Sequence, residues 1–167
     1  MFKYRVENLL DAFDRGDVNV VAHQANCFNA MGAGIAKQIA IRYPIAKEVD
    51  DKTERGDMNK LGNISIASLG DKAIFNLYGQ YMPGQETKYA AQRLCLYKMQ
   101  VKMGPYLKHV KLGIPQIGCG LGGGNWPLVY SIIMEELVHT NTTIYVLDEK
   151  FVPADHKHLI EDSSNAN

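Results

Sequence analysis

The stretch Val21–Ala36, with the sequence VAHQANCFNAMGAGIA, predicts a strand that runs through a loop into a helix. The apolar run from Val18 to His23 is typical of a buried strand, and a polar turn is expected from Gln24 to Asn29. Glycines then open a helix at 33–42. Such a helix start leaves backbone N–H groups unpaired beside the positive end of the helix dipole. The stretch therefore predicts an anion site, for which phosphate is the commonest ligand.

This motif alone leaves open a plain helix–strand packing role, and it is neither a Walker A loop nor a full Rossmann fingerprint. A second glycine loop strengthens the case for phosphate. Val110–Pro115 is expected to be a strand that runs into five glycines between Gly118 and Gly124, with a helix from Pro127 to His139. Loops of this kind converge beyond the carboxyl ends of the strands of an α/β sheet. Two of them indicate one cleft that holds a diphosphate from both sides.

The other segments alternate between strands and helices. Strands are expected at 2–7, 61–68, 73–78 and 142–147, and helices at 45–54 and 88–106. The strands 61–68 and 73–78 are expected to pair antiparallel across the Gly70-Asp71 turn. The fold class is therefore α/β, with a mixed central sheet and helices on both faces. We expect one domain over residues 1–153 and a polar, disordered tail over residues 154–167.

The composition of the 167 residues is that of a globular protein of ordinary kind. Eighteen basic and eighteen acidic residues balance, so no overall field draws the chain to nucleic acid or to an anionic membrane. The three cysteines, Cys27, Cys95 and Cys119, are too far apart to indicate a zinc site or a disulfide framework. No signal peptide or bilayer-spanning run is visible. We expect a soluble, intracellular, cytoplasmic monomer that needs neither a metal nor another cofactor.

The two loop motifs together, HQANCFNAMGAGIA and PQIGCGLGGGNW, closely resemble those of the macrodomain family, which binds ADP-ribose. More narrowly, they look like the branch of the ADP-ribose 1''-phosphate phosphatases and the terminal ADP-ribose protein glycohydrolases. The order of segments agrees from Tyr4 to about Leu147. The resemblance implies a three-layer α/β/α sandwich with ADP-ribose, or its 1''-phosphate, in the cleft.

The resemblance also implies which residues touch the ligand. Asn8 and Leu9 stand where the family holds adenine, with Asn8 in place of the usual aspartate, and Asn26 stands at the distal ribose. The segment around Leu147 to Phe151 is where family members often cover the adenine. The implied ligand contacts are Asn8, Leu9, Ala25, Asn26, Met31, Gly32, Ala33, Gly34, Ile35, Ala36, Gly118, Cys119, Gly120, Leu121, Gly122 and Leu147.

Catalytic candidates are fewer. His23, expected at the mouth of the first loop, has a near-neutral pKa suited to acid–base work, although a histidine that only ends a strand is the plain alternative. Asn26 and Gln80 are candidates to position a water. Cys119 lies in an anion loop that could activate a thiol, but we interpret it as a packing residue.

The glycohydrolase subgroup relies on a lysine and an aspartate, and in this chain their positions fall at Gln80 and Gly122. We therefore do not expect this chain to use the covalent lysine mechanism of that subgroup. We expect a phosphatase that hydrolyses ADP-ribose 1''-phosphate to ADP-ribose and phosphate. The alternatives are a reader that binds ADP-ribose without turnover and a hydrolase of ADP-ribosyl groups on protein or nucleic acid.

Overall fold

The computed structural model describes residues 2–84 and 86–161, and within them the centre of the molecule is a six-stranded sheet. The sheet has the order β1-β6-β5-β2-β4-β3. Its strands are β1 (Phe2–Val6), β2 (Val20–Asn26), β3 (Ile64–Leu69), β4 (Lys72–Gln80), β5 (Lys111–Ile114) and β6 (Asn141–Val146). Strand β3 pairs antiparallel with β4, and the other pairs are parallel. The predicted mixed sheet and its hairpin are confirmed.

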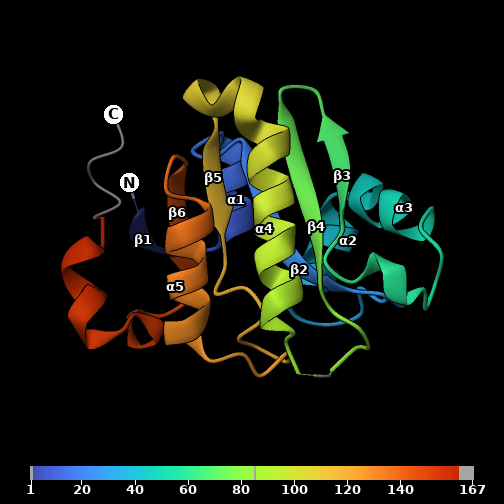
Figure 1. The fold of residues 1–167 in the computed structure, drawn as a ribbon. Helices are drawn as coiled ribbons and strands as arrows, with labels where there is room; N and C mark the ends of the chain where they lie inside the picture. The colour runs from blue at the N-terminus through green and yellow to red at the C-terminus, as the bar shows by residue number, and fades with distance from the viewer. Residues whose placement is uncertain (1, 85, 162–167) are drawn as a thin grey trace.

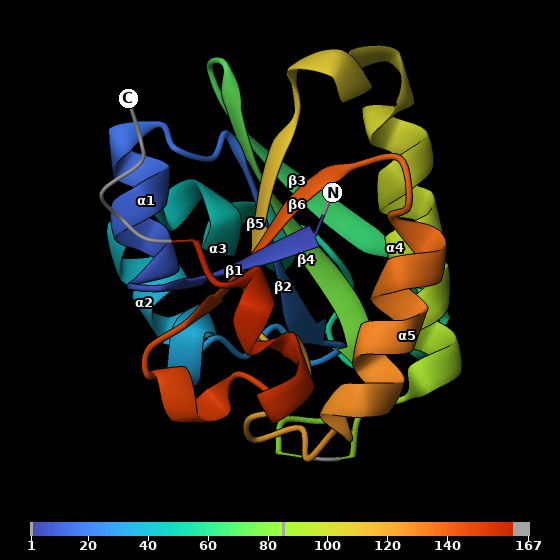
Figure 2. The ribbon, with the colours of Figure 1, turned by 90° about the vertical axis from the view of Figure 1, so that its left-hand side faces the viewer.

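Helices cover both faces of the sheet (Figure 1, Figure 2). One face carries α4 (Tyr89–Met103) and α5 (Trp126–Glu136), and the other carries α1 (Leu9–Arg15), α2 (Gly34–Arg42) and α3 (Pro44–Asp51). Short 3₁₀ segments complete the described chain: η1 (Met58–Lys60), η2 (Gly104–His109), η3 (Glu149–Phe151) and η4 (Ala154–Leu159). The result is the expected three-layer α/β/α sandwich. None of these helices has the length and apolar character needed to cross a membrane.

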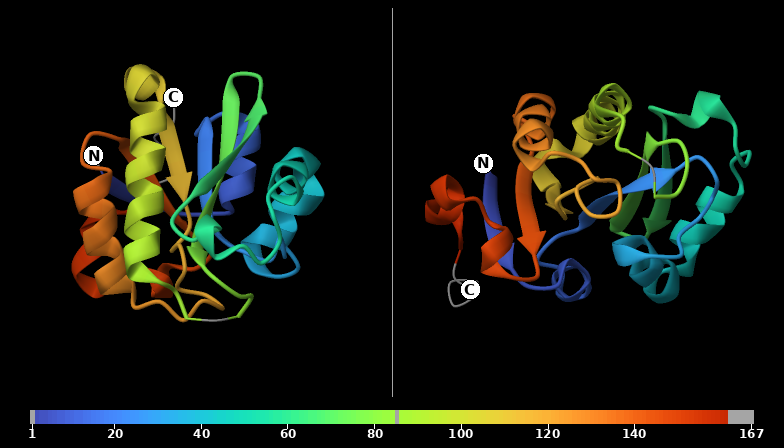
Figure 3. Two further views of the ribbon diagram at one scale, coloured as in Figure 1. Left: turned by 45° about the vertical axis from the view of Figure 1, so that its right-hand side comes forward. Right: turned by 90° about the horizontal axis from the view of Figure 1, so that it is seen from below.

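The central strand β2 explains how side chains are divided between the two layers. Side chains alternate along a strand, so Val20 and Ala22 belong to the core beneath α4 and α5, whereas Val21 belongs to the core beneath α1 to α3. Gln24 continues the first row and His23 the second. The carboxyl ends of β2, β4 and β5 lie at one edge of the sheet, where the loops that follow them gather (Figure 3). This edge holds the site described below.

Two local predictions are wrong. The first concerns the expected polar turn from Gln24, because β2 continues through Asn26 and its polar residues pair with β4. The second concerns the tail, because residues 154–161 are ordered. Ile160 forms a parallel bridge to Tyr4, and Lys3 pairs with Glu161 at 2.8 Å. This segment is ordered because two of its apolar residues, Leu159 and Ile160, pack against the core beneath α4 and α5. Residues 162–167 of the predicted tail lie outside the described residues.

Candidate functional site

A cavity of about 370 Å³, called the cleft below, opens at the carboxyl ends of β2, β4 and β5. Both glycine loops contribute to it, together with the ends of β2 and β4. The residues that line it are Gln24, Asn26, Ala30, Gly32, Ala33, Gly34, Ile35, Ala36, Gln80, Pro83, Gly84, Pro115, Gln116, Ile117, Gly118, Gly120, Leu121 and Gly122. The structure thus brings together two segments that are more than 80 residues apart in the sequence.

The first wall of the cleft is the N-terminus of α2. Its capping residue, Ala33, supplies no side-chain hydrogen bond, and the first turn carries no acidic residue. Gly34 begins the helix with φ at +54°, a left-handed conformation that favours glycine. The amides of Gly34, Ile35 and Ala36 come before the first helical hydrogen bond, which Lys37 makes to the carbonyl of Ala33. These amides and the helix dipole are therefore available to an anion in the cleft.

Asn26 fastens the first loop onto itself. Its Oδ1 accepts hydrogen bonds from the amides of Phe28 at 3.0 Å and Ala30 at 3.3 Å, and its Nδ2 donates to the carbonyl of Ala30 at 2.7 Å. The oxygen is thus occupied twice by backbone, whereas one of the two Nδ2 hydrogens is used. Toward a ligand, Asn26 can act chiefly as a hydrogen-bond donor.

The second wall is the segment Gly118–Gly122, called loop 2 below. Within the described chain, the amides of Gly118, Gly120, Leu121 and Gly122 donate to no backbone carbonyl, whereas Cys119 donates to Gln116. Thr87 fastens loop 2 from behind, because its amide donates to the carbonyl of Gly122 at 2.8 Å. Like the first wall, loop 2 offers backbone donors and no negative side chain to a ligand.

Gln24 is the main cleft residue that the sequence prediction missed. Its side chain lies between the end of β4, loop 2 and α4, and it bonds to Gln80, Thr87 and Gln92. A register shift in the β2–β4 ladder after Ala25 places Asn26 beside Gln80. Such a bulge redirects side chains near functional sites. The alternation of β2 carried a signal, since Gln24 follows Val20 and Ala22 on one face.

His23 does not lie in the cleft, which corrects the prediction of an acid–base residue at the mouth of the first loop. Its side chain is fully buried on the opposite face of the sheet from Gln24, and Nε2 lies 2.7 Å from Oδ1 of Asn76. Burial lowers the pKa of the imidazole, against a smaller opposing effect of the Asn76 bond. The plain alternative, a histidine at the end of a strand, is correct in giving His23 a hydrogen bond and no catalytic contact, but His23 lies in the middle of β2.

Other residues implied by the resemblance also lie outside the lining of the cleft: Asn8, Leu9, Ala25, Met31, Cys119 and Leu147. Asn8 caps α1 through a hydrogen bond that its Oδ1 accepts from the amide of Leu10, and the side chain of Leu9 is packed against Gly113. Leu147 is 72% exposed. Burial raises the pKa of the Cys119 thiol to about 11, which supports its interpretation as a packing residue.

Gln116 links the cleft to the segment after the last strand. It lines the cleft, and its Nε2 donates to the carbonyl of Phe151 at 2.9 Å. The Phe151 ring is about half exposed, with the Lys150 ammonium above it. This part of the expected adenine cover therefore contacts the wall of the cleft directly, whereas Leu147 does not line it.

The chemistry of the cleft is set by amides. Among the described residues that line it, no side chain is a carboxylate, imidazole, ammonium, guanidinium, thiol or phenol. In the same part of the chain, no group of three or more histidine, cysteine, aspartate or glutamate side chains is placed to hold a metal. The cleft thus offers hydrogen-bond donors from backbone and amide side chains to a ligand rich in oxygen acceptors.

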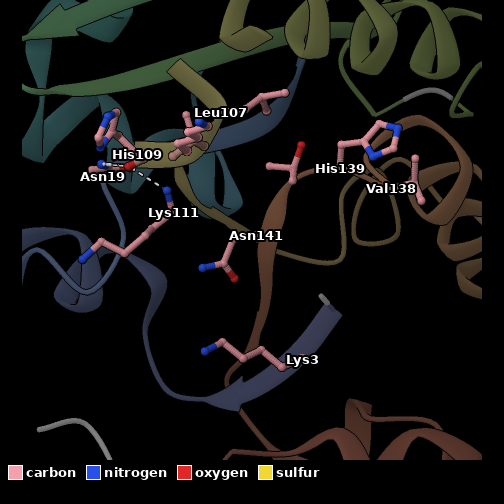
Figure 4. Close-up of a pocket in the computed structure, with 11 residues that line it drawn as sticks. Lys3, Asn19, Leu107, His109, Lys111, Val138, His139 and Asn141 are labelled. Atoms are coloured by element: carbon pink, nitrogen blue, oxygen red, sulfur yellow. Dashed lines mark hydrogen bonds between the residues drawn. The ribbon is translucent and has the colours of Figure 1, made fainter. Parts of the chain in front are cut away.

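A larger cavity, of about 910 Å³, lies at the other end of the sheet, where β1, β5 and β6 begin (Figure 4). It is lined by Lys3, Asn19, Leu107, Lys108, His109, Val110, Lys111, Val138, His139, Thr140 and Asn141. Asn19 ties its wall together through bonds to His109 and Lys111. Neither glycine loop reaches this cavity, and ligands of open α/β sheets bind beyond the carboxyl ends of strands. The cleft is therefore the candidate site.

Comparison with known proteins agrees with the geometry. No family model matches the chain. An uncharacterised 17.5 kDa protein of phage T4 is 35% identical over 118 residues, which cover 68% of this chain and 76% of the phage protein. ADP-ribose 1''-phosphate phosphatases of Candida glabrata and Saccharomyces cerevisiae are 26% and 27% identical over 161 and 158 residues. Each match covers 77% of this chain and 89% of the phosphatase.

Solved structures agree on the fold. The macrodomain of Thermus aquaticus DarG superposes with a TM-score of 0.70 at 23% identity, over 87% of this chain and 97% of that chain. Thermosipho africanus DarTG, solved in complex with ADP-ribose, gives 0.66 at 18% identity, over 83% of this chain and 40% of that chain. The fold is that of a macrodomain. The chain is thus a macrodomain by its fold, and the phage T4 protein is related to it in sequence.

Proposed function

We propose that the cleft binds ADP-ribose, with the diphosphate between the N-terminus of α2 and loop 2. The observation that carries this proposal concerns the two walls of the cleft. Their backbone amides donate to no backbone carbonyl in the part of the protein that the structure describes. Amide donors at a helix start and in a glycine loop suit phosphate oxygens. The ADP-ribose complex of the DarTG neighbour supports the same ligand by analogy of fold.

We propose further that the ligand that turns over is ADP-ribose 1''-phosphate, with ADP-ribose and phosphate as products. The two yeast relatives named for this activity support the proposal. In the reaction, a water oxygen bonds to phosphorus and the bond from phosphorus to the bridging oxygen breaks. A proton of the water passes to that oxygen, so ADP-ribose leaves neutral at its 1'' hydroxyl.

The residues of the cleft bear on how this reaction would proceed. With no ionisable side chain among the described lining residues, the attacking water would be held by the side-chain amide of Asn26, of which one Nδ2 hydrogen is used by Ala30. An oxygen of the ligand phosphate would then take this proton from the water and pass it to the bridging oxygen as the bond from phosphorus breaks. Such a reaction lacks the rate contribution of roughly 10²- to 10⁴-fold that a positioned acid or base supplies.

The same observation favours a second function, a reader that binds ADP-ribose without turnover. Neutral donors are sufficient for binding, and the lysine and aspartate positions of the glycohydrolase subgroup hold Gln80 and Gly122. The two functions share the cleft and differ only in whether phosphate is released.

The test is calorimetric titration with ADP-ribose, beside phosphate release from ADP-ribose 1''-phosphate. The variant that tests the placement of the diphosphate is Gly120→Glu. Gly120 lines the cleft, and a Cβ there meets no protein atom within 4 Å. We expect unchanged thermal stability and loss of ADP-ribose binding, since a carboxylate would face the diphosphate. Binding without release assigns the reader function. Full binding by Gly120→Glu would contradict the proposed placement of the diphosphate.

A further inference from the structure

Behind loop 2, four side chains form one continuous hydrogen-bonded chain: Gln92, Gln24, Thr87 and Gln80. Nε2 of Gln92 lies 3.0 Å from Oε1 of Gln24. Nε2 of Gln24 lies 2.8 Å from Oε1 of Gln80 and 3.0 Å from Oγ1 of Thr87. Thr87 and Gln92 are buried, and Gln24 and Gln80 line the cleft. The chain therefore connects the interior of α4 with the ligand site.

Three backbone carbonyls fix the direction of every hydrogen bond in this chain. Nε2 of Gln92 lies 3.2 Å from the carbonyl of Ile117, which can only accept, so the other amide hydrogen of Gln92 goes to Gln24. Oγ1 of Thr87 likewise donates to the carbonyl of Gly118 at 2.7 Å, and Nε2 of Gln80 to that of Met82 at 3.0 Å. Gln24 must then donate from its nitrogen to both Thr87 and Gln80. A flipped amide at Gln24 or Gln92 would place oxygen against oxygen.

The direction decides what the cleft can offer. Gln92 and Gln24 use both hydrogens of their amide groups, and Thr87 uses its single hydroxyl hydrogen. Gln80 receives a bond at its oxygen and spends one hydrogen on Met82. Among the side-chain polar hydrogens of these four residues, the second Nε2 hydrogen of Gln80 is the one that has no acceptor in the part of the protein that the structure describes. Gln80 is half-buried and stands beside Asn26 in the ladder.

We propose that Gln80 is a fixed hydrogen-bond donor to an anionic oxygen substituent on the distal ribose, and that Gln92 and Gln24 are positioning residues that hold its orientation. The inference rests on the proposed function, because Asn26, which pairs with Gln80 in the ladder, is the residue that the family resemblance places at the distal ribose. It deepens that function by naming the residue that selects a phosphate over a hydroxyl at the 1'' carbon. A donor that cannot rotate to present its oxygen favours a phosphate, which only accepts at its ionised oxygens.

The glycines around the chain support a built arrangement. A Cβ at Gly79 would lie 2.5 Å from Oε1 of Gln24, and a Cβ at Gly118 would lie 2.7 Å from the same atom. A Cβ at Gly122 would lie 2.7 Å from Oγ1 of Thr87. Any side chain at these three positions would therefore displace Gln24 or Thr87. The space that the glutamine chain needs is the space that these glycines leave.

The experiment compares two ligands by calorimetry: ADP-ribose, and a 1''-phosphonate analogue in which a methylene group replaces the bridging oxygen, so that it cannot be hydrolysed. We expect the wild-type protein to prefer the phosphonate. Gln80→Met should weaken phosphonate binding about 10- to 100-fold, as expected for loss of a hydrogen bond to a charged group, and should change ADP-ribose binding less than about threefold.

Gln92→Met tests the positioning role, and Gln100→Met is its matched control. Gln100 lies on the same helix and accepts a hydrogen bond from Thr140, far from the cleft. We expect Gln92→Met to reduce the preference for the phosphonate as Gln80→Met does, with no further loss in the double variant. Gln100→Met should keep the preference. Equal weakening of both ligands by Gln92→Met would overturn the positioning role.

The outcomes separate this inference from the proposed function. Failure of the wild-type protein to bind ADP-ribose rejects the proposed function. Binding of ADP-ribose with no preference for the phosphonate, or with a preference that survives Gln80→Met, rejects the inference alone. Because Gln80 is partly exposed, Gln80→Met tests the inference even where Gln92→Met does not fold.

Discussion

Nε2 of His23 lies 2.7 Å from Oδ1 of Asn76, and neither side chain is exposed to solvent. Asn76 in turn donates to the carbonyl of Ala46 on α3 and to the hydroxyl of Ser65 on β3. The pair thus joins the central strand to the layer of α1 to α3. A histidine held in this way contributes to the packing of the fold and does not reach the cleft.

His23→Gln should therefore leave ligand binding almost unchanged. The glutamine amide can still donate to Asn76, and the cleft lies on the other side of β2. We expect ADP-ribose affinity within about threefold of wild type, and the same rate of any phosphate release. Calorimetry and a phosphate assay measure the two quantities. Abolished release with intact binding would return His23 to a catalytic role.

The stability of the protein should fall as the pH drops below 6.5, and His23 should cause part of the fall. Its pKa is lowered in the folded state by burial, so the unfolded chain binds more protons between 6.5 and the folded pKa. Stability from this group is present above pH 6.5 and is lost as the pH falls through that window. Urea unfolding of wild type and His23→Gln at pH 7 and pH 5 measures the difference.

The expected difference has a limit and a control. One group contributes at most about 1.4 kcal/mol per pH unit to the free energy of unfolding. The buried carboxyl of Asp50, whose pKa burial raises, titrates in the opposite sense and is present in both proteins. An identical pH dependence in the two proteins would show that the pKa of His23 is the same in the folded and unfolded states, so that burial does not lower it.

The sequence predicted the fold well because its signals are local. Glycines in turns mark the limits of the β3–β4 hairpin. Pro44 ends the helical stretch after Arg42 and begins α3. The two glycine loops each followed a strand and preceded a helix, so their meeting at one sheet edge followed from the topology of parallel strands.

The site was predicted less well because its side chains depend on long-range contacts. His23 and Gln24 are neighbours, and the face that each occupies is decided by partners more than 50 residues away, Asn76 and Gln80. The sequence prediction ended the strand at His23 and put Gln24 in a turn, so it did not show that the two residues lie on different faces or which face opens into the cleft. The order of residues 154–161 likewise depends on Tyr4, at the other end of the chain.

Removal of residues 154–167 should destabilise the protein. Tyr4 is fully buried, and its hydroxyl lies 3.0 Å from Nδ1 of His156. The deletion would also remove the bridge from Ile160 and the ion pair from Glu161 to Lys3. We expect a loss of about 2 kcal/mol or more in the free energy of unfolding, measured by urea titration. A chain that ends at Glu161 is the control, because it keeps all these contacts.

Gly34→Ala should cost stability, whereas Gly32→Ala should not. A Cβ meets no atom within 4 Å at either position, but Gly34 has φ at +54° and Gly32 has no positive φ. A residue with a Cβ costs about 1–2 kcal/mol in the left-handed conformation. The difference between the two variants in thermal unfolding isolates this backbone effect. Equal stabilities would mean that α2 begins differently in solution.

Gly122→Ala should disturb loop 2, and Gly120→Ala should not. A Cβ at Gly122 would lie 2.7 Å from the carbonyl oxygen of Gly118 and from Oγ1 of Thr87, whereas a Cβ at Gly120 meets nothing within 4 Å. We expect Gly122→Ala to lose about 1–3 kcal/mol of stability, as overpacked sites do, and to bind ADP-ribose more weakly because the loop must shift.

The same crowding bears on the aspartate that the glycohydrolase subgroup carries at this position. Gly122→Asp must displace Gly118 or Thr87, so it should fail to create glycohydrolase activity even when Gln80→Lys is added. Release of ADP-ribose from a modified protein measures this activity, and thermal unfolding of Gly122→Ala and Gly120→Ala measures the crowding. A Gly122→Ala protein as stable as Gly120→Ala would show that Thr87 and loop 2 separate readily. An aspartate would then fit at position 122 without displacing Gly118 or Thr87. Failure of the double variant Gly122→Asp, Gln80→Lys to release ADP-ribose would then have a cause other than crowding.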